Sequence, residues 1–286
     1  MNKVFASILV ALALASGIVK FHYGLAIGDE FFFDVPRTVL NAFFSGWGVA
    51  QGEPNAPYNN LTLYCHPDRV LCGFYDNHDN IAGLQIALDQ SEFDFANATF
   101  DWEAQGYSNW TPPVSFGQRR RTYWTTQLFF VSPYSFDLYP RNNTGHVLRD
   151  DKLFVTGFNK EIYTISGNET VIKNDSSIFT QQACINWMGR HYFYNMTEAT
   201  QCNSHSLFPW FPMYDSNELV GVGFLTTGIH RVVSGQRDWF ERHPEFAVKA
   251  IIPHGPRCLY DLAKKNQLIT MRIYFVDEPW LIGCPL

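Results

Sequence analysis

The stretch CGFYDNHDNIAGLQIAL occupies residues 72–88, and FPMYDSNELVGVGFL occupies residues 211–225. Each contains an apolar or aromatic residue, then Tyr-Asp, then a short polar turn, and then an apolar run. Aromatic and β-branched runs on either side of an Asp/Asn turn are typical of two paired strands. Both stretches therefore predict antiparallel hairpins in a β-rich protein.

A second phrase follows each hairpin. Residues 125–133 read TTQLFFVSP, and residues 270–279 read TMRIYFVDEP. Two phrases in the same order predict an internal duplication, in which residues 61–133 and 207–279 share strand order and direction. The alternative is that unrelated hairpins resemble each other because the same physical rules select their residues.

The repeated Tyr-Asp pair predicts a local structure. Tyr75-Asp76 and Tyr214-Asp215 are expected at the ends of equivalent hairpin strands. An Asp at the start of a turn accepts hydrogen bonds from backbone N–H groups about two residues later. We expect Asp76 and Asp215 to do so, which gives these residues a structural role.

Strand signals dominate the rest of the chain and are bounded by Gly, Pro, Asn and Asp. The expected strands are residues 61–65, 69–75, 81–88, 123–131, 161–165, 191–194, 219–225 and 270–276. Only residues 37–44 and 257–265 read as short helices. The pattern predicts a mainly β protein, an antiparallel sandwich or a jelly roll, with two related β-lobes at residues 18–150 and 151–286.

The N-terminal sequence MNKVFASILVALALASG reads as a signal peptide over residues 1–17. Lys3 gives a positive start, residues 4–14 are mostly apolar, and small residues follow. The alternative is an N-terminal membrane anchor, but Lys20 ends the uncharged stretch early for a span of roughly 20 residues. No later segment is apolar enough to cross a bilayer, so we expect no span after signal removal.

Seven Asn-x-Ser/Thr triplets support an extracellular location. They begin at Asn60, Asn97, Asn109, Asn142, Asn168, Asn174 and Asn195. Charged residues form only 17% of the chain and aromatic residues 16%, so glycans would supply solubility that charges do not. The net charge of −6 argues against nucleic acid as a partner.

The six cysteines predict three disulfides in an oxidising compartment. They are Cys65, Cys72, Cys184, Cys202, Cys258 and Cys284. Fifteen pairings of six cysteines exist, and we favour the local scheme, which pairs each cysteine with the next one along the chain. A thiolate metal site is the alternative, but the chain contains no Cys-x-x-Cys.

Three segments of the C-terminal half form a recognisable series. They are CINWMGRHYFYNM at residues 184–196, FPWFPMYDSNELVGVGF at residues 208–224, and RIYF at residues 272–275, followed by Cys284. In these segments the chain resembles an uncharacterised group of secreted invertebrate disulfide-bonded proteins. Because that group has no established activity, the resemblance implies only a secreted, disulfide-bonded β protein.

The predicted layout is also similar to that of the copper-dependent, ascorbate-using monooxygenases, which have two tandem β-lobes. Those enzymes bind copper through a His-His pair in one lobe and a His-x-His with a Met in the other. This chain contains neither histidine motif. The similarity therefore concerns architecture, and architecture does not carry function.

Five residues are weak candidates for a metal site, because imidazole and thioether groups bind copper or zinc. They are His66, His78, His191, Met196 and His205. His66 and His78 flank a predicted hairpin, and the other three lie within or just beyond the expected loop between Cys184 and Cys202. The alternative is that each is an ordinary surface or core residue.

Carboxylates among aromatic residues suggest sugar hydrolysis as another possibility. Asp94, Asp101 and Glu103 lie near Trp102, Tyr107 and Trp110. Two carboxyl groups can share acid and base work while aromatic rings stack on a sugar. In a strand, Asp101 and Glu103 would point to the same face. The alternative, which we favour, is a polar loop that carries the triplets at Asn97 and Asn109.

We therefore expect a secreted, N-glycosylated, disulfide-stabilised protein with a binding or structural role in an extracellular fluid or matrix. The expected partner is an extracellular ligand or protein, and the sequence assigns it no identity and no cofactor. The alternative is a secreted enzyme, first a copper-dependent oxidoreductase and second a glycan hydrolase.

Overall fold

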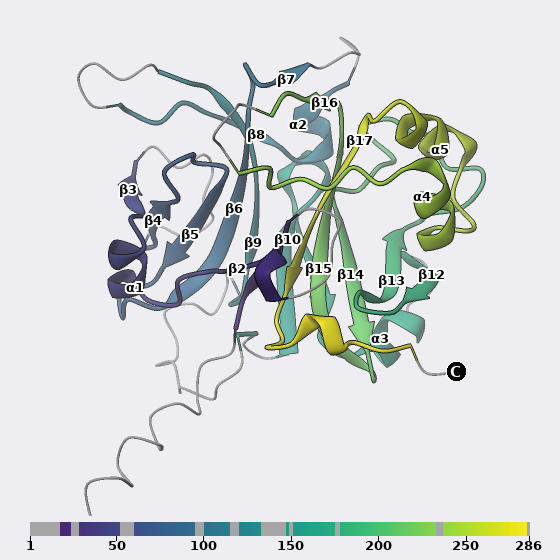
Figure 1. The fold of residues 1–286 in the computed structure, drawn as a ribbon, viewed down its shortest axis with the longest axis horizontal. Coiled ribbons are helices and arrows are strands. Elements are labelled where there is room, and N and C mark those ends of the chain that lie inside the picture. The colour runs from purple at the N-terminus through teal and green to yellow at the C-terminus, as the bar shows by residue number, and fades with distance from the viewer. Residues whose placement is uncertain are drawn as a thin grey trace, which may run out of the picture.

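Two antiparallel β-sheets pack face to face in this protein, as the computed structural model shows (Figure 1). The structure describes residues 18–23, 29–51, 60–94, 100–114, 120–132, 147–148, 151–174, 178–232 and 237–284. The predicted signal peptide and the triplets at Asn97 and Asn142 lie outside the described residues. The prediction of a mainly β, antiparallel sandwich is confirmed.

Each sheet is built from strands of both halves of the chain. In order across the sheet, the first contains β11 (Ile162–Ser166), β10 (Lys152–Thr156), β9 (Tyr123–Phe129), β6 (Ile81–Asp89), β5 (Leu71–Tyr75), β4 (Thr62–Cys65) and β3 (Gly48–Ala50), with β8 (Ser108–Trp110) also paired to β9. The second contains β12 (Phe179–Ile185), β13 (Gly189–Tyr194), β14 (Trp210–Asp215), β15 (Glu218–Thr227), β17 (Leu268–Tyr274), β1 (Lys20–His22) and β2 (Phe32–Asp34). A small separate ladder pairs β7 (Phe93–Asp94) with β16 (Ile229–His230).

The main core lies between the two sheets. Leu84 and Ile86 of β6 belong to the same buried cluster as Val222 and Phe224 of β15. In each strand these residues are two positions apart, so they point to the same face. All eight strands expected from the sequence are present, because their alternate apolar residues fill this interior.

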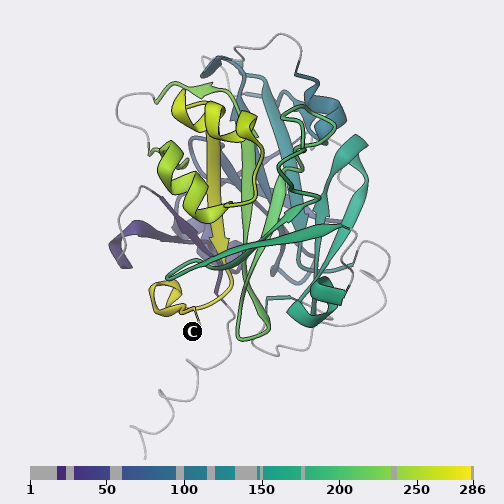
Figure 2. The same cartoon turned by 90° about the vertical axis from the view of Figure 1, so that its right-hand side faces the viewer.

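Helices cover the outer face of the second sheet. The α-helices of the described residues are α1 (Val39–Phe44), α2 (Trp102–Gln105), α3 (Glu169–Asn174), α4 (Glu245–Ile251) and α5 (Arg257–Lys264), and the 3₁₀ turns are η1 (Asp29–Phe31), η3 (Phe158–Lys160) and η4 (Pro279–Leu281). Figure 2 shows α4 and α5, in yellow-green, lying against this sheet. No helix in the described part of the chain is long and apolar enough to cross a bilayer.

Only α1 and α5 match the predicted helices, so the expectation of one or two helices was too low. The other helices have four to seven residues, and α1 has six, so length does not separate the helices that were predicted from those that were missed.

The two halves of the chain exchange their first hairpins. Strands β1 and β2 precede the strands of the first sheet in sequence, yet β1 pairs with β17 of the second sheet. Strands β10 and β11 begin the second half, yet β10 pairs with β9 of the first sheet. The sheets therefore do not follow the expected boundary at residue 150.

The strand order is the same in both sheets. The series β4-β5-β6-β9-β10-β11 corresponds position by position to β13-β14-β15-β17-β1-β2, and every pairing is antiparallel. Each sheet also has a register shift in its central hairpin, just before Tyr75 in one and Tyr214 in the other. Tyr75 donates to the carbonyl of Pro36 (2.7 Å), and Tyr214 donates to that of Ser166 (2.6 Å). Residues of one half therefore have structural counterparts in the other.

A glycine occupies the same position in both central strands. Gly83 of β6 pairs with Phe129 of β9, and Gly221 of β15 pairs with Tyr274 of β17. A Cβ atom added at either glycine would lie 2.5 Å from the carbonyl oxygen of the residue before that partner, Leu128 or Ile273. Any other side chain would force the strands apart at this position.

The first hairpin turn has the predicted Asp geometry. The Asp76 carboxylate accepts hydrogen bonds from the backbone N–H groups of His78 (3.0 Å) and Asn80 (2.8 Å). The prediction for Asp76 is therefore confirmed.

The prediction for Asp215 is wrong. Its hairpin closes through Ser216 and Asn217, which have φ of +50° and +70°, as a two-residue type I′ turn requires. Asp215 pairs with Glu218 directly across the turn. This turn is one residue shorter than the first, and the Asp215 carboxylate contacts the Ser216 hydroxyl (3.4 Å) in place of a backbone N–H group.

The structure contains three disulfides. They are Cys65–Cys72, Cys184–Cys284 and Cys202–Cys258. The first joins directly opposite residues of β4 and β5 and agrees with the predicted pairing.

The predicted pairs Cys184–Cys202 and Cys258–Cys284 are wrong. The C-terminal segment returns to the turn between β12 and β13, where Trp187 donates to the carbonyl of Ile282 (2.7 Å). That return brings Cys284 to Cys184. Cys202 pairs instead with Cys258 of α5. Local spacing carries no information about these long-range contacts.

Candidate functional site

The metal candidates predicted from the sequence do not converge. His78 and His205 are exposed in separate turns, whereas Met196 is buried in the core beneath α4 and α5. His191 is also buried, on β13. Among the described residues, no group of three or more His, Cys, Asp or Glu side chains is arranged to hold a metal ion.

His191 is a core residue in its chemistry as well as its position. Its ring stacks against Phe193 and Phe211, and its Nδ1 atom lies 3.3 Å from the carbonyl of Ala183. Burial, assisted by the positive charge of Arg272, lowers the pKa of His191 to about 3. The imidazole is therefore neutral at physiological pH.

The carboxylates near residue 100 are occupied by structural contacts. Asp101 caps α2 by accepting a hydrogen bond from the backbone of Ala104 (3.0 Å), and Glu103 pairs with Lys160 (3.3 Å). Residues 102–105 form a helix in place of the polar loop that we favoured, and the strand that would put both carboxylates on one face is absent here. Asp94 ends β7, in a different ladder.

The aromatic residues near these carboxylates are buried as well. Trp102, Tyr107 and Trp110 all belong to the core and offer no open face to a sugar ring. Without paired free carboxylates or a stacking surface, this region lacks the arrangement that glycoside hydrolysis needs.

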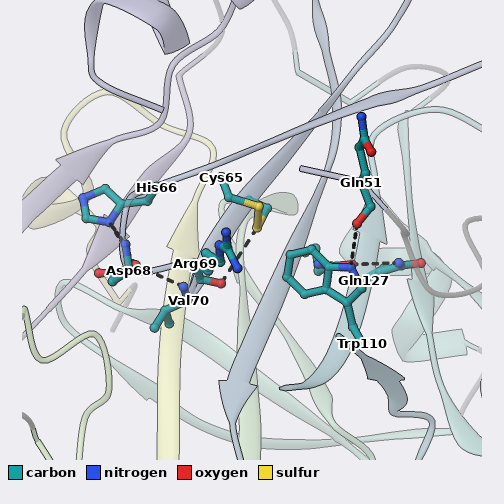
Figure 3. The surroundings of a disulfide bond; sticks show 10 residues. Gln51, Cys65, His66, Asp68, Arg69, Val70, Trp110 and Gln127 are labelled. Atoms are coloured by element: carbon teal, nitrogen blue, oxygen red, sulfur yellow. Dashed lines mark hydrogen bonds and ion pairs between the residues drawn. A yellow bond between two sulfur atoms is a disulfide. The ribbon is translucent and has the colours of Figure 1, made fainter. Parts of the chain in front are cut away.

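His66 lies in a more distinctive environment, in the turn that the Cys65–Cys72 disulfide closes (Figure 3). Its Nδ1 atom lies 2.9 Å from an oxygen of Asp68. The same carboxylate accepts hydrogen bonds from the indole N–H of Trp239 (2.6 Å) and the backbone N–H of Val70 (3.0 Å). Asp68 thus links this turn to a segment 171 residues away.

The carboxylate of Asp68 holds the His66 ring in place and favours one of its tautomers. Burial alone would raise the pKa of Asp68, but hydrogen bonds from His66 and Trp239 lower it below its ordinary value. An ionised oxygen at 2.9 Å favours the neutral tautomer of His66 with its proton on Nδ1 and an acceptor at Nε2, although the backbone N–H of Asp68 also lies 3.4 Å from Nδ1. The pair therefore has the geometry of a base held in position by a carboxylate.

Aromatic rings surround the His66 ring edge to face. The centroid distances are 5.2 Å to Trp239, 5.8 Å to Phe33 and 6.2 Å to Trp47, with interplanar angles of 83–90°. The side chain of His66 is 23% exposed, so solvent reaches part of it.

A cation lies over the same rings. The guanidinium carbon of Arg237 is 4.7 Å from the ring centres of Tyr23 and Phe33, and 4.9 Å from that of Trp239. These cation–π contacts tie β1, β2 and residues 237–241 together. The surroundings of His66 are thus a packed junction between the halves of the chain, and the described residues place no serine, threonine or cysteine nucleophile in hydrogen-bond contact with its ring.

A second charged cluster lies on the outer face of the second sheet. Glu241 is buried and accepts hydrogen bonds from His22 and Arg272, and it also pairs with His243 (3.0 Å) and the hydroxyl of Thr270 (3.3 Å). Burial would raise the pKa of Glu241, but the Arg272 guanidinium and the two histidines hold it well below its ordinary value. Both carboxylate oxygens of Glu241 are therefore engaged by internal partners.

The cavity beside this cluster is small. It has a volume of about 20 Å³ and is lined by His243, Thr270 and Arg272 on one side and by apolar residues of α4 and the sheet on the other. This volume holds about one water molecule. The cluster is therefore a structural ion network.

A larger cavity, of about 170 Å³, lies beside α3. Its wall contains Glu169, whose buried carboxylate pairs with Lys173 (3.2 Å) and Arg190 (3.2 Å) and accepts a hydrogen bond from Tyr192 (2.8 Å). The single negative charge of Glu169 is thus shared between Lys173 and Arg190, at a site open to water.

Sequence reasoning identified His66 but missed the partners that define its environment. Asp68 had a local signal, because the disulfide loop CHPDRVLC places an Asp two residues after the His. No local signal pointed to Trp239, Arg237 or Glu241, because nothing near them in the sequence relates them to β1 or to the turn between β4 and β5.

No family model, no curated protein and no solved structure matches this chain.

Proposed function

We propose that this protein acts outside the cell as a secreted, N-glycosylated binding protein. Three disulfides stabilise its β-sandwich. The resemblance of its C-terminal half to secreted invertebrate proteins is in keeping with this proposal.

The exposure of the glycosylation triplets is the observation that carries the proposal. Five of the seven asparagines lie in the described residues, and every one of them is exposed: Asn60, Asn109, Asn168, Asn174 and Asn195. A glycan can be attached only at an asparagine that the fold leaves accessible. Buried positions would have argued for chance triplets.

Binding is favoured over catalysis by the state of the ionisable groups. The Glu241, Glu169 and Asp101 carboxylates are engaged in internal bonds, and His191 is neutral and buried. These groups stabilise the fold and leave few free for acid–base chemistry.

A secreted enzyme is the second candidate, and the His66–Asp68 pair is the observation that favours it. A partly exposed imidazole held by a carboxylate is a suitable general base. Such an enzyme would use this pair, whereas the copper and glycan-hydrolase alternatives have no assembled site in the described residues.

The test is expression of the full chain in secreting animal cells. We expect the protein in the medium, with a mass that falls in several steps when N-glycans are removed enzymatically. Peptide mapping without reductant should recover Cys184 linked to Cys284. Retention in the cytosol, or an unchanged mass after glycan removal, would contradict the proposal. Metal analysis of the same protein tests the copper alternative.

A further inference from the structure

An apolar surface remains exposed at one end of the first sheet. Its side chains come from α1 and the edge strand β3 and have large exposed fractions: Leu40 62%, Phe43 68%, Phe44 77% and Val49 59%. We call these four residues the α1 surface. Figure 1 shows α1 and β3 at the extremity of the molecule, on the side away from α4 and α5.

The second half of the chain shows that the fold does not require this surface. Each of α1 and α3 follows an isolated bridge to the central hairpin turn, Thr38 with Asn80 and Asn168 with Glu218. The backbone N–H of the first residue of each helix also donates to the hairpin turn of its own half. Val39 donates to the carbonyl of Asp79 (3.0 Å), and Glu169 donates to that of Asn217 (2.9 Å). The two helices are therefore equivalent in position.

Matched positions of the two helices have opposite chemistry. Ala42 and its counterpart Ile172 are buried and anchor the helices to the sheets. At three of the four exposed positions, Leu40, Phe43 and Phe44 correspond to Thr170, Lys173 and Asn174. At the fourth, Asn41 corresponds to Val171, which is 52% exposed. Asn174 also begins a glycosylation triplet. In the same structural role α1 thus exposes three large apolar side chains and α3 exposes one, which indicates a specific use for α1.

The charge around α1 limits the kind of partner. Residues 38–51 contain no Asp, Glu, Lys or Arg, and the whole chain has a net charge of −6. Such a surface has no means of attracting an anionic partner or pairing with a charged groove. Contact through it would depend on apolar burial and change little with salt.

The area of the α1 surface distinguishes between two candidate partners, a second copy of the chain and a lipid layer. Two largely exposed Phe side chains with one Leu and one Val offer on the order of 500 Å², below the roughly 800 Å² per partner of a stable protein interface. A second copy of the chain would therefore be held weakly. Shallow insertion into a lipid layer needs no complementary groove and only a few projecting apolar side chains.

We propose that the α1 surface inserts into the surface of a zwitterionic phospholipid layer. This inference rests on the proposed extracellular function, because it names the partner of that binding protein. Leu40, Phe43, Phe44 and Val49 enter the boundary between headgroups and acyl chains, and the second half of the molecule, with its triplets on α3, faces the water.

The test is flotation of the full chain with phosphatidylcholine vesicles. The wild-type protein is expected to float with the vesicles at low and at high salt, and less well when phosphatidylserine is added, because its own charge is negative. A triple substitution, Leu40→Thr, Phe43→Lys and Phe44→Asn, copies α3 onto α1. We expect at least about a tenfold loss of vesicle partitioning.

Two further variants keep the test decisive. Phe44→Asn alone changes the most exposed side chain and creates no new glycosylation triplet, because residue 46 is glycine. It should lower partitioning even if the triple variant fails to fold. Phe246→Lys, at a residue of α4 that is 76% exposed, is the matched control and should leave partitioning unchanged.

Three results would overturn the inference. They are a folded wild-type protein that stays free of vesicles, an equal loss in Phe246→Lys, and a lipid-independent dimer that the triple substitution dissociates, which would make the occupant a second copy. A secreted, glycosylated protein that ignores vesicles would refute this inference alone. Cytosolic retention would refute the proposed function, whatever the vesicles show.

Discussion

Glu241 is the residue on which the outer face of the second sheet most depends. Its buried carboxylate neutralises Arg272 and contacts His22 and His243. Glu241→Gln would leave the guanidinium buried without a counter-charge, and we expect it to lower the free energy of unfolding by about 3–5 kcal/mol. Urea denaturation at neutral pH measures this. Glu245→Gln, on the surface of α4, is the control and should have little effect.

The same carboxylate makes stability depend on pH. The pKa of Glu241 is lower in the folded protein than in the unfolded chain, as is that of Asp68. The unfolded chain therefore binds protons first as the pH falls, so this stabilisation is full above the ordinary carboxyl pKa and is lost in acid. Wild-type stability should fall below about pH 4, more steeply than that of Glu241→Gln. Parallel curves would contradict this role.

Gly83 and Gly221 give a prediction that tests the correspondence between the halves. At each, a new Cβ atom would meet a backbone carbonyl oxygen, whereas at Gly48 it would meet nothing within 4 Å. Gly83→Ala and Gly221→Ala should each lower the free energy of unfolding by about 1–3 kcal/mol. Gly48→Ala should be nearly neutral. Chemical denaturation of the three variants gives the comparison, and a stable Gly221→Ala protein would refute the close approach.

At the scale of elements, sequence pattern predicted what local physics controls. All eight expected strands and the helices α1 and α5 are present, because their alternation or amphipathic spacing matches the faces that they bury. The pattern missed longer strands such as β10 and β12 as well as β1 and β2, which have three residues each. Strands this short depend on pairing with β17 and with each other, and that information lies far away in the sequence.

The disulfides differ in the length of chain that they close. Cys184–Cys284 spans 100 residues and Cys65–Cys72 spans 7. The chain-entropy model gives the longer loop about 2 kcal/mol more stabilisation. Replacing both cysteines of the long bridge with Ser should therefore lower the midpoint of unfolding more than the same change at the short bridge. Equal shifts would mean that native packing, rather than loop length, sets the effect.

At the scale of the whole molecule, the exchanged hairpins explain why two lobes predicted from repeated phrases form one unit. The phrases mark equivalent hairpins, but β1 and β2 complete the sheet of the second half, and β10 and β11 complete that of the first. The inter-sheet core also contains residues of both halves. A boundary at residue 150 marks the repeat in sequence, whereas no such boundary separates the sheets.

This exchange predicts how the molecule behaves when its chain is cut. No disulfide joins residues before 150 to those after it, so only non-covalent contacts hold the halves together. After cleavage at a protease site introduced between residues 133 and 146, we expect both fragments to elute together in native gel filtration. They should separate in urea without reductant, because urea removes the pairing of β1 with β17 and of β10 with β9.

A second cut provides the matched control. Cleavage at a site introduced between residues 233 and 236 falls inside the loops closed by Cys202–Cys258 and Cys184–Cys284. Those fragments should separate only when reductant is added to the urea. If the fragments of the first cut dissociate in native buffer, the exchanged hairpins and the shared core do not bind the halves together. The halves would then be two independent lobes, each able to close its own sheet.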